Sequence, residues 1–347
     1  MSTQNRGNLP KRDLEEIVNY AQVSLEKLGS ARILICGGTG FIGTWLTSAL
    51  LEANSTLKLK LKIVLITRDI ENAKKVLNVK SMDPIEFVHG DLGAAENPFI
   101  NLKGSFSHII HGATSTTLPT SGYTWDADYK STVLGASRLV DLSSQMVVPP
   151  TLLHMSSGAV YGVQPLQLVH IPEGWVNKNL TSEISLYGRA KLDAEDILVQ
   201  ASNSSILGAV NPRLFTFYGP KLPLNGKYAI GNFLHDAMDG KKILIKGNPN
   251  TRRSYMYPTD LIEWIITCLI NPSLGPLHIG SDRAVTIAEL SNYFALKFGT
   301  KVSGIGYETK PASNYVPGIL LTSKAINVSQ RLTFEEGINR WISWLNQ

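Results

Sequence analysis

The chain has 347 residues, of which 43% are hydrophobic and 18% charged, a composition typical of a globular protein with a large core in one domain or two unequal ones. Its formal net charge is +5, but the basic residues are dispersed apart from short pairs such as Lys241-Lys242. We therefore expect no nucleic-acid partner. Cys36 and Cys268 form no metal-ligand pattern and no disulfide framework, which favours a reducing compartment.

The N-terminal residues are polar and lack the apolar core of a secretory signal. The longest apolar stretch, residues 261–270, is interrupted by Glu263 and is too short to span a bilayer. We expect a cytoplasmic protein with no membrane partner.

Residues 13–28 carry apolar side chains along one stripe, which predicts an amphipathic helix. Asp13 and Glu16 resemble a capping pair at its start, and Gly29 is suited to end it. We expect this helix, within an N-terminal extension of residues 1–29, to dock on the core fold or to form an oligomer contact.

From residue 31 onward, predicted strands alternate with predicted helices. The strands are predicted at 32–36, 62–66, 85–89, 108–111, 152–155 and 206–210, and the helices at 41–53, 71–77, 126–146 and 185–202. This alternation predicts an α/β fold with a doubly wound parallel sheet, a Rossmann domain over residues 30–218. Shorter elements rich in Gly and Pro predict a smaller substrate-binding lobe over residues 219–347, partly interleaved with the Rossmann core.

A glycine-rich turn lies between the first predicted strand and the first predicted helix of this domain. Gly37 permits a tight turn, Gly40 lets the backbone approach a pyrophosphate, and Gly43 allows the helix to pack closely on the strand. Phe41 and Ile42 open the helix, whose N-terminus offers free N–H groups to an anion. The segment predicts a dinucleotide-binding site.

The end of the second strand distinguishes the two nicotinamide cofactors. A carboxylate there binds the ribose hydroxyls of NAD, whereas an Arg accommodates the additional phosphate of NADP. Arg68 stands at this point and Asp69 follows it, so we favour NADP and keep NAD as the alternative. We expect further cofactor contacts from Asp91 and Leu92 after the third strand and from Ala113 after the fourth.

Tyr187 and Lys191 are separated by four positions, so on a helix both side chains project from one face. A phenol has a pKa of about 10, which a nearby ammonium and the positive nicotinamide ring lower toward the working range. Such a phenol suits proton transfer. Ser157 follows the fifth predicted strand, at the edge where open α/β sheets bind ligands.

With these motifs in this order, the sequence resembles the extended short-chain dehydrogenase/reductase family, in particular its nucleotide-sugar epimerase/dehydratase branch. Further matching segments are residues 156–162, 212–215, 218–220, 253–257 and 277–281. The resemblance implies that Ser157 holds the reacting sugar oxygen, Tyr187 is the acid/base, and Lys191 anchors the cofactor ribose. It also implies that Arg253 faces the diphosphate of a nucleotide-sugar substrate. We expect a homodimer and no metal.

Two positions depart from the family pattern. In the family's 4,6-dehydratases an Asp-Glu pair follows the catalytic hydroxyl, but here Gly158 and Ala159 stand there, so we expect no 4,6-dehydration. Where many epimerases have an Asn that contacts the substrate phosphate, this chain has Thr216, which is our candidate for that contact.

The leading prediction is therefore an NADPH-dependent reductase of a 4-keto sugar on a nucleotide diphosphate. The alternative is a C4 epimerase with bound NAD, which would use the same residues. A non-catalytic nucleotide- or RNA-binding member of the fold is a third possibility, which the intact Ser157, Tyr187 and Lys191 argue against.

Overall fold

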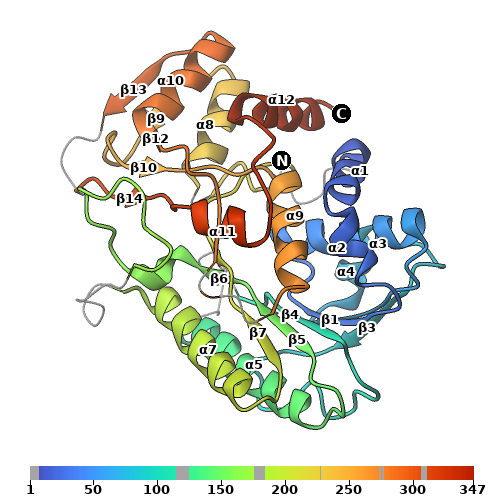
Figure 1. Ribbon diagram of the computed structural model, residues 1–347. Helices are drawn as coiled ribbons and strands as arrows, with labels where there is room; N and C mark the ends of the chain where they lie inside the picture. The colour runs from blue at the N-terminus through green and yellow to red at the C-terminus, as the bar shows by residue number, and fades with distance from the viewer. Residues whose placement is uncertain are drawn as a thin grey trace.

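Parallel strands form the central sheet of the computed structural model, in the order β3-β2-β1-β4-β5-β7 (Figure 1). Their bounds are Arg32–Cys36 (β1), Lys62–Thr67 (β2), Ile85–His89 (β3), His108–His111 (β4), Thr151–His154 (β5) and Gly208–Val210 (β7). The structure describes residues 8–114, 125–175, 184–226, 228–272, 275, 277–305 and 311–347. The strand order reverses between β1 and β4, as in a doubly wound nucleotide-binding fold. The predicted fold class is confirmed.

Helices cover both faces of this sheet (Figure 1). One face carries α1 (Lys11–Tyr20), α2 (Gln22–Glu26), α3 (Phe41–Leu57) and α9 (Pro258–Leu269), and the other carries α5 (Trp125–Ser144) and α7 (Leu186–Asn203). A shorter helix, α4 (Ile70–Leu77), follows β2. The strands and helices predicted between residues 32 and 210 are all present, and only their ends differ.

The C-terminal part of the chain builds a second core, whose buried side chains run from Tyr218 to Leu345. It contains α8 (Ala229–Met238), α10 (Ile287–Phe298), α12 (Phe334–Leu345) and the paired strands β9 (Ile243–Ile245) and β13 (Val302–Ile305). Two small sheets connect it to the central sheet: β11-β8-β6, formed by His278–Ile279, Arg213–Leu214 and Ser156–Ser157, and β12-β10-β14, formed by Val285–Thr286, Arg252–Arg253 and Asn314–Tyr315. The short helix α11 (Leu320–Ala325) follows β14. The division at residue 218 stays a prediction.

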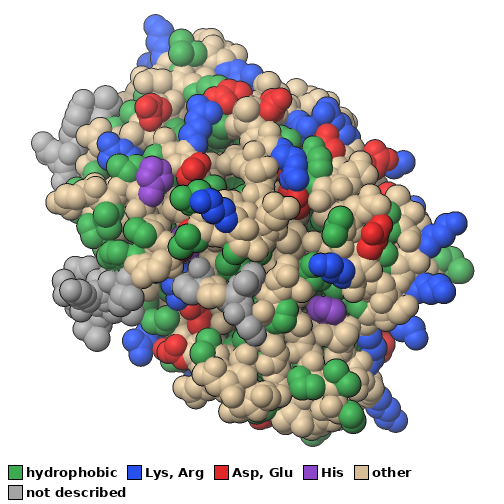
Figure 2. All heavy atoms as spheres, viewed as in Figure 1, with side chains coloured by type: hydrophobic (Ala, Val, Ile, Leu, Met, Phe, Trp, Pro, Cys, Tyr) green, Lys and Arg blue, Asp and Glu red, His purple; other side chains and the backbone are tan. Residues whose placement is uncertain are grey.

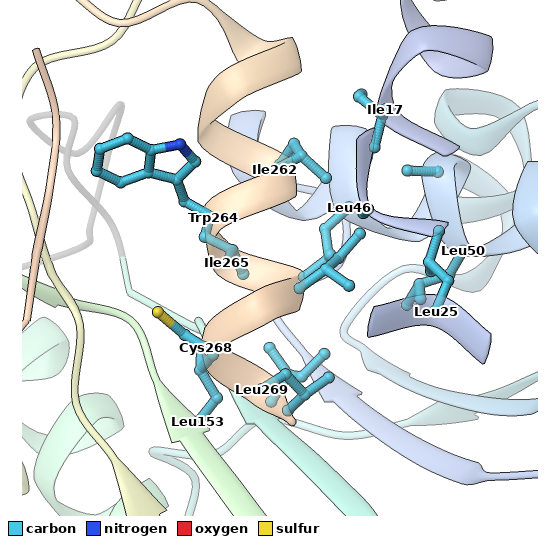
Figure 3. Packing of buried hydrophobic residues seen from close by; sticks show 14 of the residues in the cluster. Ile17, Leu25, Leu46, Leu50, Leu153, Ile262, Trp264, Ile265, Cys268 and Leu269 are labelled. Carbon is cyan, nitrogen blue, oxygen red and sulfur yellow. The ribbon is translucent and has the colours of Figure 1, made fainter. Parts of the chain in front are cut away.

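The helix α9 lies within the C-terminal part of the sequence but packs on the central sheet. Figure 3 shows Ile262 on the side of α9 that faces Ile17 and Leu46, and Cys268 on the side that faces Leu153 of β5. The helix is thus enclosed between the sheet and the N-terminal helices.

The N-terminal segment differs from the single predicted helix. A turn at Ala21 divides it into α1 and α2, and both Ile17 and Leu25 are fully buried. The predicted capping pair is wrong, because α1 begins after Pro10 and its first turn has no side-chain cap. The Asp13 carboxylate is buried instead, where it accepts from Tyr257 Oη at 2.6 Å and from Arg340 Nη1 at 2.7 Å.

Charged side chains of both signs are visible on one face of the molecule (Figure 2). On the face shown in Figure 2, Lys and Arg alternate with Asp and Glu and do not gather into one patch. None of the helices in the described part of the chain has the length and apolarity that crossing a membrane requires.

We predict that Arg340→Ala lowers the free energy of unfolding by about 3 kcal/mol, because it leaves a buried carboxylate without its cation. Burial raises the pKa of Asp13, so protonation relieves the penalty in acid and the loss should grow with rising pH. Denaturant titration at several pH values measures both effects. Arg283→Ala is the matched control: its partner Glu335 is exposed, and the loss should stay below about 1 kcal/mol. Equal losses in the two variants would contradict this account.

Candidate active site

The turn between β1 and α3 has a geometry that requires glycine. Gly37 has a φ of +95°, and a side chain there would overlap the backbone of Gly112 and Ala113. A Cβ on Gly43 would overlap the carbonyl oxygen of Gly37, whereas a Cβ on Gly40 would lie 3.7 Å from that oxygen, an ordinary contact. No side chain of these glycines covers the backbone N–H groups at the N-terminus of α3, which fits binding of the pyrophosphate of a dinucleotide.

A cleft of about 1300 Å³ lies along this turn and the carboxyl ends of the central strands. Most of the site residues predicted from the sequence line it. They are Gly37, Gly40, Phe41, Ile42, Gly43, Arg68, Asp91, Leu92, Ala113, Ser157, Tyr187, Lys191 and Thr216. The structure thus brings the predicted cofactor and catalytic residues to one place.

The end of β2 and the start of α4 form one end of this cleft. The Asp69 carboxylate caps α4 by accepting from the backbone N–H of Asn72 at 2.9 Å. Arg68, whose side chain is 60% exposed, places Nη1 3.8 Å from Asp91 Oδ2. Lys75 lines the same end. This end carries two cationic side chains, while the carboxylate nearest to β2 is engaged in capping.

Tyr187, Lys191 and Ser157 meet in the middle of the cleft. Lys191 is 1% exposed, and its Nζ donates to the carbonyl oxygen of Met155 at 2.7 Å. Burial lowers the pKa of Lys191 to about 7. Its Nζ lies 5.9 Å from the ring centroid of Tyr187. Burial raises the pKa of Tyr187, and a hydrogen bond with Ser157 acts against that rise.

Local features bring Tyr187 and Ser157 together. Ser185 caps α7 by accepting from the backbone N–H of Gly188, so the helix begins just before the tyrosine. A Cβ on Gly188 would overlap a carbonyl oxygen of the 3₁₀ helix Gly158–Tyr161, which directly follows Ser157. Glycine at this position lets α7 pack directly on that short helix.

A buried hydrogen-bond network supports Ser157 from behind. Ser156 Oγ donates to the Glu195 carboxylate, which also accepts from Nε and Nη2 of Arg213 at 3.0 and 2.7 Å. Nη1 of Arg213 donates to Tyr161 Oη at 2.8 Å, and that hydroxyl lies 2.6 Å from His278 Nε2. His278 Nδ1 lies 2.8 Å from a backbone carbonyl oxygen, so Nδ1 carries the hydrogen and Nε2 accepts from Tyr161. Every partner in this chain of bonds is consistent with a neutral His278.

Sequence reasoning missed several residues of the cleft wall. Tyr228, Tyr315, Phe217 and Lys221 line it, and Phe217 stacks on Phe41 with ring centroids 5.2 Å apart. Phe217 and Lys221 follow β8, Tyr228 precedes α8 and Tyr315 is on β14, and no local motif marks them as site residues.

Arg253 is not among the described residues that line the cleft. Its Nη1 donates to the carbonyl oxygens of Arg252 and Ser313 at 2.8 and 3.1 Å, and its Nη2 donates to Ser313 Oγ at 3.2 Å. Its guanidinium carbon lies 5.9 Å from the ring centroid of Tyr315, its neighbour on the adjacent strand. The contact of Arg253 with a substrate diphosphate stays a prediction.

Packing around position 158 also disfavours an acidic residue after Ser157. A Cβ on Gly158 would lie 2.6 Å from the ring of Phe215, so a carboxylate side chain does not fit there. Glu173 is the next acidic residue along the chain, and its carboxylate accepts from backbone N–H groups at the start of α11.

We predict that Gly43→Ala lowers the thermal stability of the protein and removes dinucleotide binding, because its Cβ overlaps the turn. Gly40→Ala should keep the stability of the unliganded protein, since its Cβ makes an ordinary contact, but should weaken binding where backbone meets pyrophosphate. Thermal melts and cofactor titration measure the two effects. Gly40→Ala with unaltered affinity would contradict the assigned turn.

Comparisons with known proteins identify similar chains. The sequence model described as the NAD dependent epimerase/dehydratase family matches residues 33–280. UDP-glucuronic acid decarboxylase 1 of Arabidopsis thaliana is 22% identical over 321 residues, which cover 90% of this chain and 69% of that protein. UDP-glucuronic acid decarboxylase 3 of the same plant is 26% identical over 260 residues, which cover 75% and 72%.

Solved structures show the same fold. An epimerase from Methanothermobacter thermautotrophicus has a TM-score of 0.76 at 18% identity, covering 95% of this chain and 96% of that one. The UDP-glucose 4-epimerase of Thermotoga maritima, solved with UDP-glucose, has a TM-score of 0.74 at 18% identity, covering 91% and 98%. The matched span contains the glycine turn, Ser157, Tyr187 and Lys191, and the chain belongs to the NAD dependent epimerase/dehydratase family.

Proposed function

We propose that this protein is an NADPH-dependent reductase of the 4-keto group of a nucleotide-diphosphate sugar. Membership of the family supports a nucleotide sugar as the substrate. The curated relatives are named for UDP-glucuronic acid, and one similar structure contains UDP-glucose. The cleft, lined by the glycine turn and by Thr216, supports binding of both a dinucleotide and such a substrate.

The chain's own residues supply the proton of this reaction. A bound reduced nicotinamide supplies the hydride. Tyr187 donates its phenolic proton to the carbonyl oxygen, which becomes the hydroxyl oxygen of the product. While the ketone is bound, Ser157 donates its one hydrogen to the same oxygen and holds it in place; once Tyr187 has given up its proton, that hydrogen is available to the phenolate. The ammonium of Lys191 stabilises the phenolate that remains.

The observation that carries the choice of NADPH is the engagement of Asp69. Its carboxylate lines the cleft but caps α4 through Oδ1, while Arg68 and Lys75 place positive charge at the same end of the cleft. An Arg near the end of the second strand accommodates the additional phosphate of NADP. A reductase consumes its reduced cofactor in each turnover, in keeping with NADPH.

A C4 epimerase is the second candidate. Similar solved structures of this fold contain NAD, among them a UDP-glucuronic acid 4-epimerase from Bacillus cereus. An epimerase would use Tyr187 first as base and then as acid. Tightly held NAD in the purified protein would favour this function, whereas uptake of NADPH by an empty site would favour the reductase.

We predict that Arg68→Ala weakens NADPH binding at least tenfold and changes NADH binding little, because it removes a charge-assisted hydrogen bond to phosphate. Fluorescence titration with both cofactors measures the ratio. Lys74→Ala is the matched control, since Lys74 pairs with Glu71 outside the cleft lining and should leave both affinities unchanged. Equal losses for both cofactors in Arg68→Ala would contradict NADP preference and strengthen the epimerase.

We predict that a nucleotide 4-keto-6-deoxyhexose is reduced with oxidation of NADPH, and that Tyr187→Phe lowers the rate by about 10²–10⁴-fold while cofactor binding persists. Absorbance of NADPH follows the reaction. Mass spectrometry of a panel of nucleotide hexoses and UDP-glucuronic acid supplies the controls. Loss of water would reveal a dehydratase despite Gly158, and loss of carbon dioxide would reveal a decarboxylase. Either product, without any ketosugar reduction, would overturn the proposed function.

A further inference from the structure

A second tyrosine lies beside Ser157. The Oη of Tyr315 is 3.0 Å from Ser157 Oγ, while a hydrogen bond also joins that serine to Tyr187. Tyr315 is on β14, which is held in register beside Arg253 of β10. Its ring packs against Phe215 with centroids 4.8 Å apart. The hydroxyl is thus held at the serine by packing on both sides.

The distances assign a direction to these hydrogen bonds. The backbone N–H of Ala159 donates to Ser157 Oγ at 3.2 Å. Tyr315 Oη has another acceptor in the carbonyl oxygen of Leu214, but at 3.4 Å this contact exceeds the range of about 2.5–3.0 Å that O–H···O bonds prefer. Ser157 is therefore the better acceptor for the hydrogen of Tyr315.

A serine hydroxyl has two acceptor lone pairs and one hydrogen. Ala159 and Tyr315 occupy the two lone pairs of Ser157, so its hydrogen is directed at the remaining neighbour, Tyr187. A hydrogen bond donated to a phenolate favours the ionised form, and donors in a chain strengthen one another.

We propose that Tyr315 is a positioning residue, which orients the Ser157 hydroxyl toward Tyr187 and so stabilises the phenolate that the reaction produces. This inference rests on the acid/base role of Tyr187 in the proposed function.

Other groups that face Tyr187 come from every element packed around it. Lys191 lies on its own helix, Asp128 is on α5, and Tyr228 directly precedes α8. Burial, Tyr315, Tyr228 and Asp128 raise the pKa of Tyr187, and the hydrogen bond with Ser157 lowers it. Tyr315 opposes the phenolate by its charge only when it is itself ionised. Burial raises the pKa of Tyr315 itself to about 12, which keeps it a protonated donor throughout the neutral range.

The experiment measures the ionisation of Tyr187 through the ultraviolet absorbance of tyrosinate, with the protein saturated with oxidised cofactor. Subtracting the titration of Tyr187→Phe from that of the wild type isolates one phenol. The same subtraction is made in a Tyr315→Phe background. We expect the midpoint to rise by about one pH unit, a tenfold change in the ionisation constant, because support for a charged group is lost.

Tyr218→Phe is the matched control. It also removes a buried phenolic hydroxyl, but one that donates to the carbonyl oxygen of Phe334 in the second core, so the midpoint should not move. The phenyl ring retained in Tyr315→Phe preserves the contact with Phe215, and thermal melts check that each variant is folded.

Kinetics provide a second readout. Reduction requires protonated Tyr187, so its rate falls at alkaline pH, and Tyr315→Phe should move this fall to higher pH with kcat reduced and KM unchanged. If Tyr315 had a purely structural role, Tyr315→Phe would lower the rate but would leave unchanged the pH at which the rate falls. A midpoint unchanged in Tyr315→Phe overturns the inference and leaves the proposed function intact. If the wild type and Tyr187→Phe titrate identically, Tyr187 does not ionise, and the proposed mechanism fails together with the inference.

Discussion

The burial of α9 against the central sheet is the constraint on which the rest of the structure depends. All residues of Pro258–Leu269 are buried, so the helix has no face for water and must be covered on every side. Asp260 and Glu263 are buried with it, where an unpaired carboxylate would cost several kcal/mol. Asp260 accepts from the backbone N–H groups of Arg331 and Leu332, and Glu263 pairs with the Arg331 side chain. The segment that leads into α12 is thereby fixed to the helix.

The entry to α9 also sets the wall of the cleft. Just before the helix, the backbone N–H of Met256 donates to the carbonyl oxygen of Thr216 at 3.1 Å. From the other side, Trp45 of α3 donates from Nε1 to the carbonyl oxygen of Pro220 at 3.1 Å. Tyr257 connects the two, since its ring meets Trp45 edge-on and its hydroxyl binds the N-terminal helix. The distance between the glycine turn and the wall is therefore set by core packing, which loops alone could not do.

The difference between local patterns and long-range packing explains what could be predicted from the sequence. The strands, the glycine turn and the pair Tyr187 and Lys191 are recognisable because each depends on residues adjacent in the chain. Asp13 looks like a capping residue for the same local reason, yet its partners are 244 and 327 positions away, and those partners decide its place. Tyr315 lies 158 positions from Ser157 and reaches it only through strand pairing. The places of Asp13 and Tyr315 depend on long-range packing, which leaves no local pattern in the sequence, so they could not be predicted.

The charges around Tyr187 follow from the same burial. His111, His154 and His278 are all enclosed, and burial lowers the pKa of His111 to about 3, of His154 well below its usual value and of His278 to about 4. They are neutral under physiological conditions and contribute no cation. With its pKa at about 7, Lys191 gains charge most readily when a negative group forms beside it. Because burial penalises either charge alone, an ammonium on Lys191, 5.9 Å from the ring centroid of Tyr187, would stabilise a phenolate there.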